Sequence, residues 1–375
     1  MKFDRTGWIT TVIVIAAVGC ASTEPSTAST ISGTSSTDAP DGPSTGATTG
    51  GSGAPAKPNA KEKDASADAP SSSSSTCSSG QWCLLFTDPA KEVFGISGIT
   101  STDVWIVGSR IFHFDGATWK DPIAGDPWKY DWSNVYARTS TDVWFVALNE
   151  APHHWNGAAL TTSAVQDPPP PLLAVWAAAS NDVWAVGGEQ QGSYGQIWHF
   201  DGVAWSDTGD RQLPWRGTGV WGTDTGVWAC GNGIAATDST LLETAGGTSP
   251  WTAAKAAFPV GQGAQSVWAS SSMDVWAAGA SVIERFDGSS WSALSTSPVT
   301  ISGTSRHIHG RASNDVWIVS SGKSADGGVY HWNGTTWSDV TPQPKADYGY
   351  AAVWESPAGD VFVGSVLGDV LRRAP

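Results

Sequence analysis

The chain has 375 residues, only 15% of them charged, with 43 Gly and 23 Trp. This composition excludes a coiled coil, a helix-rich enzyme and disorder along the whole chain. The formal net charge is −15, and no block of Lys or Arg accompanies the aromatic residues, so we expect no nucleic-acid partner.

The first twenty residues have the organisation of a secretory signal. Basic residues precede an apolar run, residues 8–18, that is too short to span a bilayer core of about 30 Å. The stretch Ala-Val-Gly-Cys at 17–20 resembles the lipobox of bacterial lipoproteins. This resemblance implies a signal peptide over 1–19, acylation of Cys20 and, because Ala21 follows the cysteine, an outer-membrane lipoprotein facing the periplasm or the exterior. The alternative is an ordinary secretory signal that contains a cysteine.

We expect residues 20–76 to consist of the lipidated Cys20 followed by a tether. The segment is rich in Ser, Thr, Gly and Pro, has no aromatic residue, and contains Ile31 as its one large aliphatic residue. Such a segment cannot bury enough apolar surface to offset the entropy of ordering, so we expect it to be disordered. As a flexible coil it would span roughly 40 Å.

From residue 77 onward the chain repeats one pattern. Its anchors are Asp-Val-Trp tripeptides and two variants: Asp103, Asp142, Asp182, Asp274 and Asp315, then Gly226 of Gly-Val-Trp and Asp360 of Asp-Val-Phe. Their average spacing of about 43 residues is the length of a four-stranded propeller blade. Seven anchors therefore predict an all-β, seven-bladed β-propeller over residues 77–375.

Each repeat carries four strand signals. The first is an apolar pair such as Val175-Trp176, and the second is the anchor run. The third ends in an aromatic residue followed by Asp-Gly or Asn-Gly, which predicts a type I′ hairpin turn. The fourth begins three residues after that glycine, at Trp119, Leu160, Trp205, Trp291 and Trp337. The stretch Val183–Trp205, with its Gly187-Gly188 pair, resembles the repeats of kelch-type propellers.

The seventh repeat lacks a fourth strand because the chain ends soon after Asp369 to Arg372. The segment from Gln81 to Phe86 reads as an unattached strand, so we expect it to pair with the last repeat and close the ring. Cys77 and Cys83 bracket its start, and in an exported protein this favours a disulfide. Cys230 replaces a Val or Ala of its repeat, which predicts a buried thiol.

The loops divide into two faces. Connections between strands one and two, and between three and four, are short and uniform; we call their end the turn face. All other connections vary in length and form the loop-rich face, which is the candidate binding face. Aromatic residues outside the repeat positions, with one arginine, fall there: Trp128, Tyr130, Trp132, Tyr194, Trp215, Arg216, Tyr348 and Tyr350. They would bind a ligand or, alternatively, plug the mouth of the channel.

Few residues point to chemistry. Four histidines share one repeat position and are interpreted as structural: His113, His154, His199 and His331. The pair His307 and His309 lacks a third metal ligand, so we expect a channel-lining pair, no metal and no cofactor. Glu355 is the sharpest anomaly, because six repeats have Gly or Ala there; it is either a solvated charge in a wide channel or a general acid or base.

The sequence thus predicts a non-enzymatic, lipid-anchored extracytoplasmic binding or scaffold module. Its partners would be the membrane, through the lipid, and a protein or carbohydrate ligand at the loop-rich face; we expect a monomer. The alternative is a glycan-active hydrolase or lyase that uses a site on that face near Glu355.

Replacing Cys20 with serine should release the protein from the membrane fraction, because the variant has no thiol to acylate. Fractionation of cells that process lipoproteins measures this. Unchanged membrane retention of the Cys20→Ser variant would contradict the lipid anchor.

Overall fold

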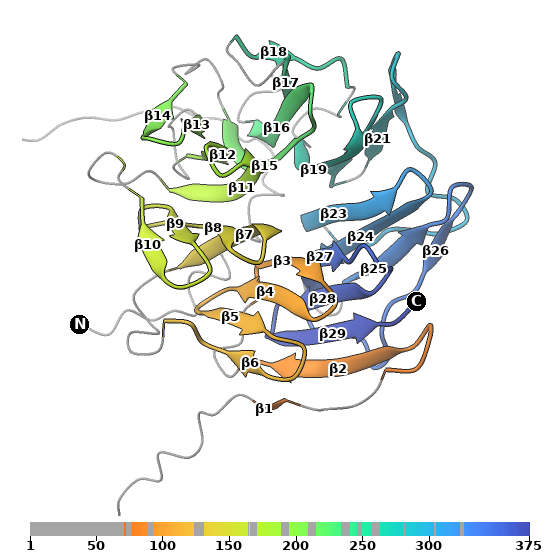
Figure 1. Ribbon diagram of the computed structural model, residues 1–375. Helices are drawn as coiled ribbons and strands as arrows, with labels where there is room; N and C mark the ends of the chain where they lie inside the picture. The colour runs from red at the N-terminus through yellow and green to blue at the C-terminus, as the bar shows by residue number, and fades with distance from the viewer. Residues whose placement is uncertain are drawn as a thin grey trace, which may run out of the picture.

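The computed structural model describes residues 71–72, 77–88, 93–123, 131–163, 165, 171–188, 195–208, 215–233, 241–245, 250–256, 258, 263–280, 282–303, 305–322 and 326–375. These residues form seven antiparallel sheets arranged in a ring (Figure 1). In this part of the chain there is no helix long and apolar enough to cross a membrane. The predicted signal peptide, Cys20 and most of the predicted tether lie outside the described residues.

Each sheet is one blade of a seven-bladed β-propeller, as predicted. Blade 1 contains β3 (Gly95–Thr100), β4 (Asp103–Val107), β5 (Ile111–Phe114) and β6 (Trp119–Lys120). Blade 2 contains β7 (Trp132–Thr139), β8 (Asp142–Ala147), β9 (His153–Trp155) and β10 (Leu160–Thr162). Blade 3 contains β11 (Leu172–Ala179), β12 (Asp182–Gly187), β13 (Gln196–Phe200) and β14 (Trp205–Asp207). Blade 4 contains β15 (Trp215–Gly222), β16 (Gly226–Gly233), β17 (Leu241–Ala245) and β18 (Thr252–Ala253).

Blades 5 to 7 follow the same order. Blade 5 contains β19 (Ala264–Ser271), β20 (Asp274–Gly279), β21 (Ile283–Phe286) and β22 (Trp291–Ala293). Blade 6 contains β23 (Ser305–Ala312), β24 (Asp315–Ser321), β25 (Gly327–Trp332) and β26 (Trp337–Asp339). Blade 7 contains β27 (Tyr350–Glu355), β28 (Val361–Ser365) and β29 (Asp369–Arg373), completed by β2 (Trp82–Thr87).

The first strand of every blade lies nearest the axis of the ring (Figure 1). Each of these seven inner strands contacts the inner strands of the two neighbouring blades, and β27 contacts β3 to complete the circle. Hydrophobic clusters between blades form the core, so each blade buries its apolar face against the next. This arrangement places the residues of the inner strands around a central channel.

Strand β2 closes the ring, as the sequence predicts. It pairs antiparallel with β29, with Cys83 opposite Arg372, and the two strands lie side by side in Figure 1. The predicted disulfide between Cys77 and Cys83 is present, with the Cα atoms 5.6 Å apart. A short strand β1 (Ser71–Ser72) pairs with β2, so the sheet begins earlier than the predicted boundary at Cys77.

The closing strand also joins blade 7 to blade 1. Phe86 is completely buried, and its ring lies 4.9 Å from that of Phe112 and 5.0 Å from that of Trp119, both in blade 1. Burying one such side chain contributes about 1.5–3 kcal/mol. Strand β2 therefore stabilises the ring by packing as well as by its backbone hydrogen bonds.

The predicted type I′ hairpin turns are wrong. In blade 1, Phe114 pairs with Trp119, so a four-residue loop joins β5 to β6. Gly116 has a φ of 90°, but no Asp or Asn of these loops has a positive φ. Instead the Asp115 carboxylate accepts hydrogen bonds from the backbone N–H groups of Ala117 and Thr118, at 3.0 and 2.8 Å. A type I′ turn would need two residues with positive φ, but this loop has one, the glycine, and the Asp side chain binds the backbone N–H groups of the loop instead.

Deleting residues 77–88 should lower the melting temperature by roughly 10 °C or more, because it exposes the edge of β29 and removes the buried Leu85 and Phe86. Deleting residues 21–70 should leave the melting temperature nearly unchanged, because that deletion spares both β1 and β2. Thermal unfolding followed by circular dichroism compares the two. Equal melting temperatures for the two truncated proteins would contradict the closure of the ring by β2.

Candidate functional site

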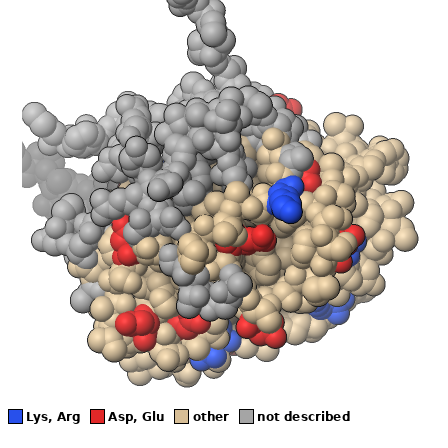
Figure 2. Space-filling model, turned by 90° about the horizontal axis from the view of Figure 1, so that it is seen from above, with Lys and Arg blue, Asp and Glu red and all other residues tan. Residues whose placement is uncertain are grey.

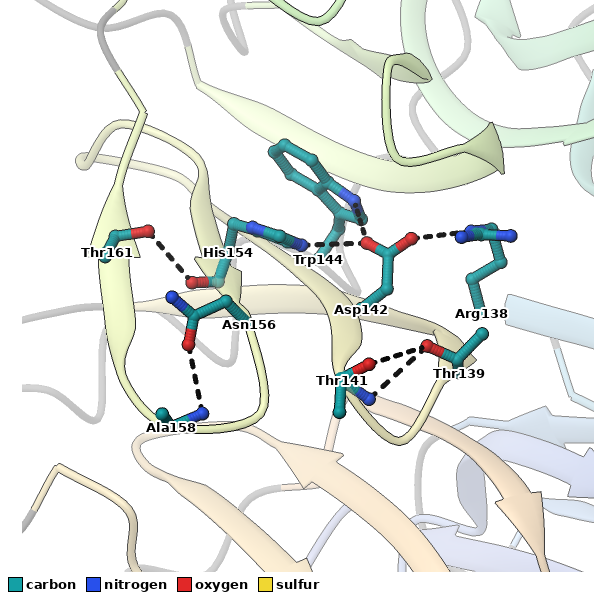
Figure 3. Close-up of polar contacts among 9 residues, drawn as sticks. All are labelled: Arg138, Thr139, Thr141, Asp142, Trp144, His154, Asn156, Ala158 and Thr161. Atoms are coloured by element: carbon teal, nitrogen blue, oxygen red, sulfur yellow. Dashed lines mark hydrogen bonds and ion pairs between the residues drawn. The ribbon is translucent and has the colours of Figure 1, made fainter.

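The anchor aspartate, present in six of the seven repeats, links the second strand of its blade to the third. In blade 2, Asp142 Oδ1 accepts hydrogen bonds from His154 Nε2 at 2.8 Å and from Trp144 Nε1 at 2.9 Å (Figure 3). Its Oδ2 accepts from Arg138 Nε at 2.6 Å, and the imidazole of His154 stacks on the Trp144 ring at 4.3 Å. All of these partners of Asp142 are side chains of its own blade.

The same arrangement recurs around the ring. His113 contacts Asp103, His199 contacts Asp182 and His331 contacts Asp315, each at 2.8 Å. In blades 5 and 7 an arginine takes the place of the histidine, with Arg285 on Asp274 and Arg372 on Asp360, both at 2.8 Å. The repeated histidines are therefore used by the fold, as their spacing indicates. The described residues contain no group of three His, Cys, Asp or Glu that could hold a metal ion.

Blade 4 lacks both members of this pair. Gly226 stands at the anchor position, and Glu243 lies opposite Trp228 where the other blades have His or Arg. An aspartate at position 226 would face the carboxylate of Glu243. The replacement of the anchor Asp by Gly therefore accompanies the replacement of His or Arg by Glu. The Trp228 Nε1 atom is buried without a hydrogen-bond partner, as are those of Trp105 and Trp317 in blades that do have the anchor aspartate.

A cavity of about 410 Å³ lies on the axis of the ring, and all seven inner strands contribute to its wall. Polar side chains in the wall satisfy backbone groups of the next blade. The N–H of Ala137 donates to Ser97 Oγ at 2.9 Å, and the N–H of Ile308 donates to Ser266 Oγ at 3.3 Å. Two blades therefore join through hydrogen bonds that neither could make alone.

His307 and His309 have the same capping role. The N–H of Val353 donates to His307 Nδ1 at 3.4 Å, and the N–H of Glu355 donates to His309 Nδ1 at 3.1 Å. Burial lowers the pKa of His307 to about 4 and that of His309 to about 3, the latter aided by the neighbouring His307. The predicted channel-lining pair is thus confirmed, and both imidazoles are neutral at pH 7.

The small residue that follows the inner-strand aromatic makes room for the preceding blade. A Cβ atom added to Gly98 would lie 2.8 Å from the Trp354 ring, and one added to Gly222 would lie 2.5 Å from the Trp176 ring. Blade 6 has His309 where those blades have tryptophan. The smaller ring explains why Glu355 of blade 7 can stand where six repeats have Gly or Ala.

Glu355 is buried, so the predicted solvated charge is wrong. Its side chain is 2% exposed, and its Oε1 atom lies 3.4 Å from Arg311 Nε, while Arg311 Nη2 lies 2.5 Å from Asp315 Oδ2. Burial, followed by the nearby Asp315 carboxylate, raises the pKa of Glu355 to about 8. A side-chain hydrogen bond with Asp315 also acts to raise the pKa of Glu355.

Glu355 also lies at the wrong end of the channel for the predicted hydrolase or lyase site. It is the last residue of β27, next to the turn face, whereas Tyr350 is the first. A strand rises about 3.3 Å per residue, so the two ends of β27 are about 17 Å apart. The loop-face aromatics and Glu355 therefore do not form one site.

Two of the predicted ligand-binding aromatic residues, Trp132 and Tyr350, are buried. Trp132 is 1% exposed because it begins β7 and packs against Phe145 and His153, with ring centroids 6.0 and 5.0 Å away. Tyr350 is 1% exposed at the start of β27. Neither can stack on a ligand, so both assignments are wrong.

The other candidates have mixed outcomes. Trp128, Tyr130 and Tyr194 lie outside the described residues, as does the side chain of Trp215. Arg216 is half-buried on β15, and burial lowers its pKa. Tyr348 is 41% exposed, as expected of a loop-face residue.

Tyr348 belongs to an exposed apolar patch that the sequence does not reveal. We use the name apolar patch for three residues of the loop-rich face, Phe94, Tyr348 and Leu367, whose exposed fractions are 41%, 41% and 37%. The N–H of Val366 donates to the Gly349 carbonyl at 3.2 Å, which joins the segments carrying Leu367 and Tyr348, and Phe94 precedes β3 at the same face. Tyr348 is also the one described non-glycine residue with a positive φ, 63°. In the sequence, each residue of the patch is an isolated apolar residue beside the end of a strand. Such residues are too common to predict an exposed patch.

Figure 2 shows how charged side chains are distributed over one face of the protein. On the edge of the ring seen in Figure 2, Lys and Arg do not gather into a patch over the described surface, and Asp and Glu are spread among them. A surface of this kind offers no stripe of positive charge to a phosphate backbone.

Comparison with known proteins gives the fold only. No protein-family model and no curated protein matches the chain. Among solved structures, YCF48 bound to D1 peptide is 15% identical, with 83% of this chain and 99% of that chain covered and a TM-score of 0.58. Virginiamycin B lyase from Staphylococcus aureus is 13% identical, with coverage of 78% and 97% and a TM-score of 0.62. The extracellular domain of a putative one-component system from B. thetaiotaomicron is 12% identical, with coverage of 78% and 39% and a TM-score of 0.59.

Replacing Glu355 with glutamine should stabilise the protein at alkaline pH. The folded-state pKa of about 8 lies above the ordinary 4.5, so the wild type loses stability as the pH rises through this window. Glutamine does not titrate, and the melting temperature of Glu355→Gln should therefore exceed that of the wild type increasingly from pH 5 to pH 8. A difference that is constant across this range would contradict the burial of an ionisable Glu355.

Proposed function

We propose that the chain is a lipid-anchored extracytoplasmic binding module whose propeller holds a protein ligand at the loop-rich face. In this proposal residues 1–19 are the signal peptide, Cys20 carries the lipid, the segment to residue 76 is the tether, and residues 77–375, built from kelch-like repeats, bind the partner. The module would reside in the outer membrane as a monomer. Its tether lets the propeller reach a partner away from the lipid surface.

The apolar patch of Phe94, Tyr348 and Leu367 is the observation that carries the proposal. Exposed apolar residues grouped on one face favour a protein interface, where aromatic side chains contribute most of the binding energy. Tyr348 has a left-handed backbone with a φ of 63°, in a turn whose Tyr348 carbonyl accepts a hydrogen bond from the N–H of Gly322 at 3.1 Å, so the fold holds this residue in place at the loop-rich face. The turn face also exposes apolar residues, Val203 by 87% and Met273 by 60%, but these two lie in separate blades, 3 and 5.

Two of the similar structures support a binding role in general terms. YCF48 is bound to a D1 peptide, and the B. thetaiotaomicron domain is the extracellular part of a putative one-component system. A carbohydrate ligand is the other candidate, since Tyr348 offers an exposed ring on which a sugar could stack. Binding to peptides and binding to glycans distinguish a protein ligand from a carbohydrate ligand.

Replacing Phe94, Tyr348 and Leu367 together with serine should abolish binding to the ligand while leaving the melting temperature within a few degrees of the wild type, because all three side chains are exposed. The full-length Cys20→Ser protein would be screened against a peptide library from envelope proteins and a glycan array, and the dissociation constant of each hit measured. The matched control replaces Val203 and Met273, exposed by 87% and 60% on the turn face, and should bind normally.

A hit that the patch variant binds as tightly as the wild type would contradict the assignment of this face. Hits confined to the glycan array would replace the protein ligand with a carbohydrate. Failure of every peptide and glycan to bind would count against the binding module itself.

A further inference from the structure

The axial cavity offers a second site, separate from the apolar patch. Its volume of about 410 Å³ lies within the range of pockets that hold small organic molecules. Arg311 and Pro357 line its turn-face end and are both exposed, so solvent reaches the cavity from that face. The patch lies on the loop-rich face, at the other end of the channel. A ligand can therefore occupy the cavity whether or not a partner covers the patch.

His307 and His309 are larger than their capping role requires. Ser266 of blade 5 stands at the position of His307 and caps a backbone N–H of the next blade in the same way. Ser97 of blade 1 stands at the position of His309 and also makes the corresponding cap. A hydroxyl group is therefore sufficient at both positions, yet blade 6 has an imidazole at both. What the imidazole adds is a second nitrogen atom, Nε2.

Each of these imidazoles offers one hydrogen-bond donor to the cavity. Nδ1 accepts a backbone N–H of blade 7 in both rings, so the ring proton of each neutral imidazole is on Nε2. Both side chains are partly exposed and line the cavity. Within the described part of the chain neither Nε2 atom has a hydrogen-bond partner, and neither belongs to the buried polar atoms. His307 and His309 alternate along β23, so their side chains share one face, roughly 6.6 Å apart along the strand.

Blade 2 presents another donor across the channel. Two blades separate it from blade 6 in one direction and three in the other, so the two lie on nearly opposite sides of the ring. Asn134 stands at the position of His307, and its Oδ1 atom accepts a backbone N–H of blade 3 at 3.4 Å, which leaves its Nδ2 group as a donor. Beside it, the Tyr136 and Trp221 rings line the wall and meet edge to face at 5.8 Å.

The cavity wall is electrically balanced at neutral pH. Burial lowers the pKa of His307 to about 4 and that of His309 to about 3, so both imidazoles are neutral. The positive charge of Arg311 is paired with Asp315 at 2.5 Å. Glu355 shares a side-chain hydrogen bond with Asp315 and, with its pKa raised to about 8, holds a proton at pH 7. A charged ligand would be buried here without a counter-charge, so the wall favours an uncharged one.

We propose that the axial cavity binds an uncharged cyclic amide, such as a cyclic dipeptide. Its carbonyl oxygens would accept hydrogen bonds from His307 and His309 on one side and from Asn134 on the other, with its apolar substituent against Tyr136 and Trp221. The first strand of each blade turns one edge to the channel, so backbone carbonyls of these strands can accept from the amide N–H groups. Carbonyl oxygens suit the side-chain donors better than hydroxyl groups do, because each hydroxyl brings a further donor that needs an acceptor.

Isothermal titration of the full-length Cys20→Ser protein at pH 7 with cyclo(Gly-Phe) and cyclo(Gly-Leu) tests the proposal. Both cyclic dipeptides should bind with dissociation constants in the millimolar range or below. The linear dipeptide Gly-Phe has the same side chain but a charge at each end, and should bind at least tenfold more weakly.

Nitrogen NMR of the imidazoles reports on the binding atoms directly. The free protein should show the proton of His307 and His309 on Nε2. Adding cyclo(Gly-Phe) should shift both Nε2 resonances while leaving those of His113 and His199, which bind anchor aspartates outside the cavity wall, unchanged. A purely structural role of the two channel histidines would give no such shift.

Substitutions that keep the backbone caps remove the donors. The double variant His307→Ser with His309→Ser should weaken binding of cyclo(Gly-Phe) about tenfold or more, since both Nε2 donors are lost, while serine makes the same caps as in blades 5 and 1. Asn134→Ser should weaken binding several-fold from the opposite side. The matched control, the serine variant of the apolar patch, should bind the cyclic dipeptides like the wild type, so the two sites can fail independently.

Equal affinity for cyclo(Gly-Phe) and linear Gly-Phe would overturn the proposal, as would failure of both cyclic dipeptides to bind at millimolar concentration. Undiminished binding by a folded double variant would also overturn it. Should that variant unfold, the NMR titration of the wild type decides: Nε2 resonances of His307 and His309 that stay in place while cyclo(Gly-Phe) binds would rule out this site.

Discussion

The hydrogen bond between an anchor aspartate and the histidine or arginine of the third strand is the contact on which the blades depend. It links the second strand of a blade to the third in six of the seven blades, and in blades 2, 3 and 5 the carboxylate also holds the indole N–H of the buried tryptophan. In Asp142, burial acts to raise the pKa, but the hydrogen bonds from His154 and Arg138 outweigh it and leave the pKa below its ordinary value. The repeated carboxylates, imidazoles and guanidinium groups therefore have a structural role in each of these blades.

A second set of contacts joins the blades at the axis, and a departure from it between blades 6 and 7 buries an ionisable group in the channel wall. Inner-strand side chains accept hydrogen bonds from the next blade, and a small residue admits the aromatic ring of the preceding blade. Between blades 6 and 7, His309 replaces the large ring and Glu355 replaces the small residue. These paired changes bury an ionisable group beside Arg311, far from the loops that distinguish the other face.

Periodicity explains what could be predicted. The spacing of the anchors predicts seven blades. The absence of a fourth strand after Asp369 predicts that β2 closes the ring, and the closeness of Cys77 and Cys83 in sequence predicts their disulfide. The errors concern properties that a repeat does not encode. Trp132 and Tyr350 each begin an inner strand, where burial depends on the neighbouring blade, and the burial of Glu355 depends on His309 across the same junction. The apolar patch unites residues from three loops that are distant in sequence, so no local pattern reveals it.

A double-mutant cycle on Asp142 and His154 tests most directly whether the repeated carboxylates serve the fold. Free energies of unfolding at pH 7 would be measured for the wild type, Asp142→Ala, His154→Ala and the double variant. The account predicts a favourable coupling of about 1.5–3 kcal/mol, the value of a hydrogen bond to a charged group. The exposed Asp224 of blade 4, combined with His154, should give additive changes. A coupling free energy near zero between Asp142 and His154 would contradict the structural role of this hydrogen bond. The two residues would then again be candidates for a functional role.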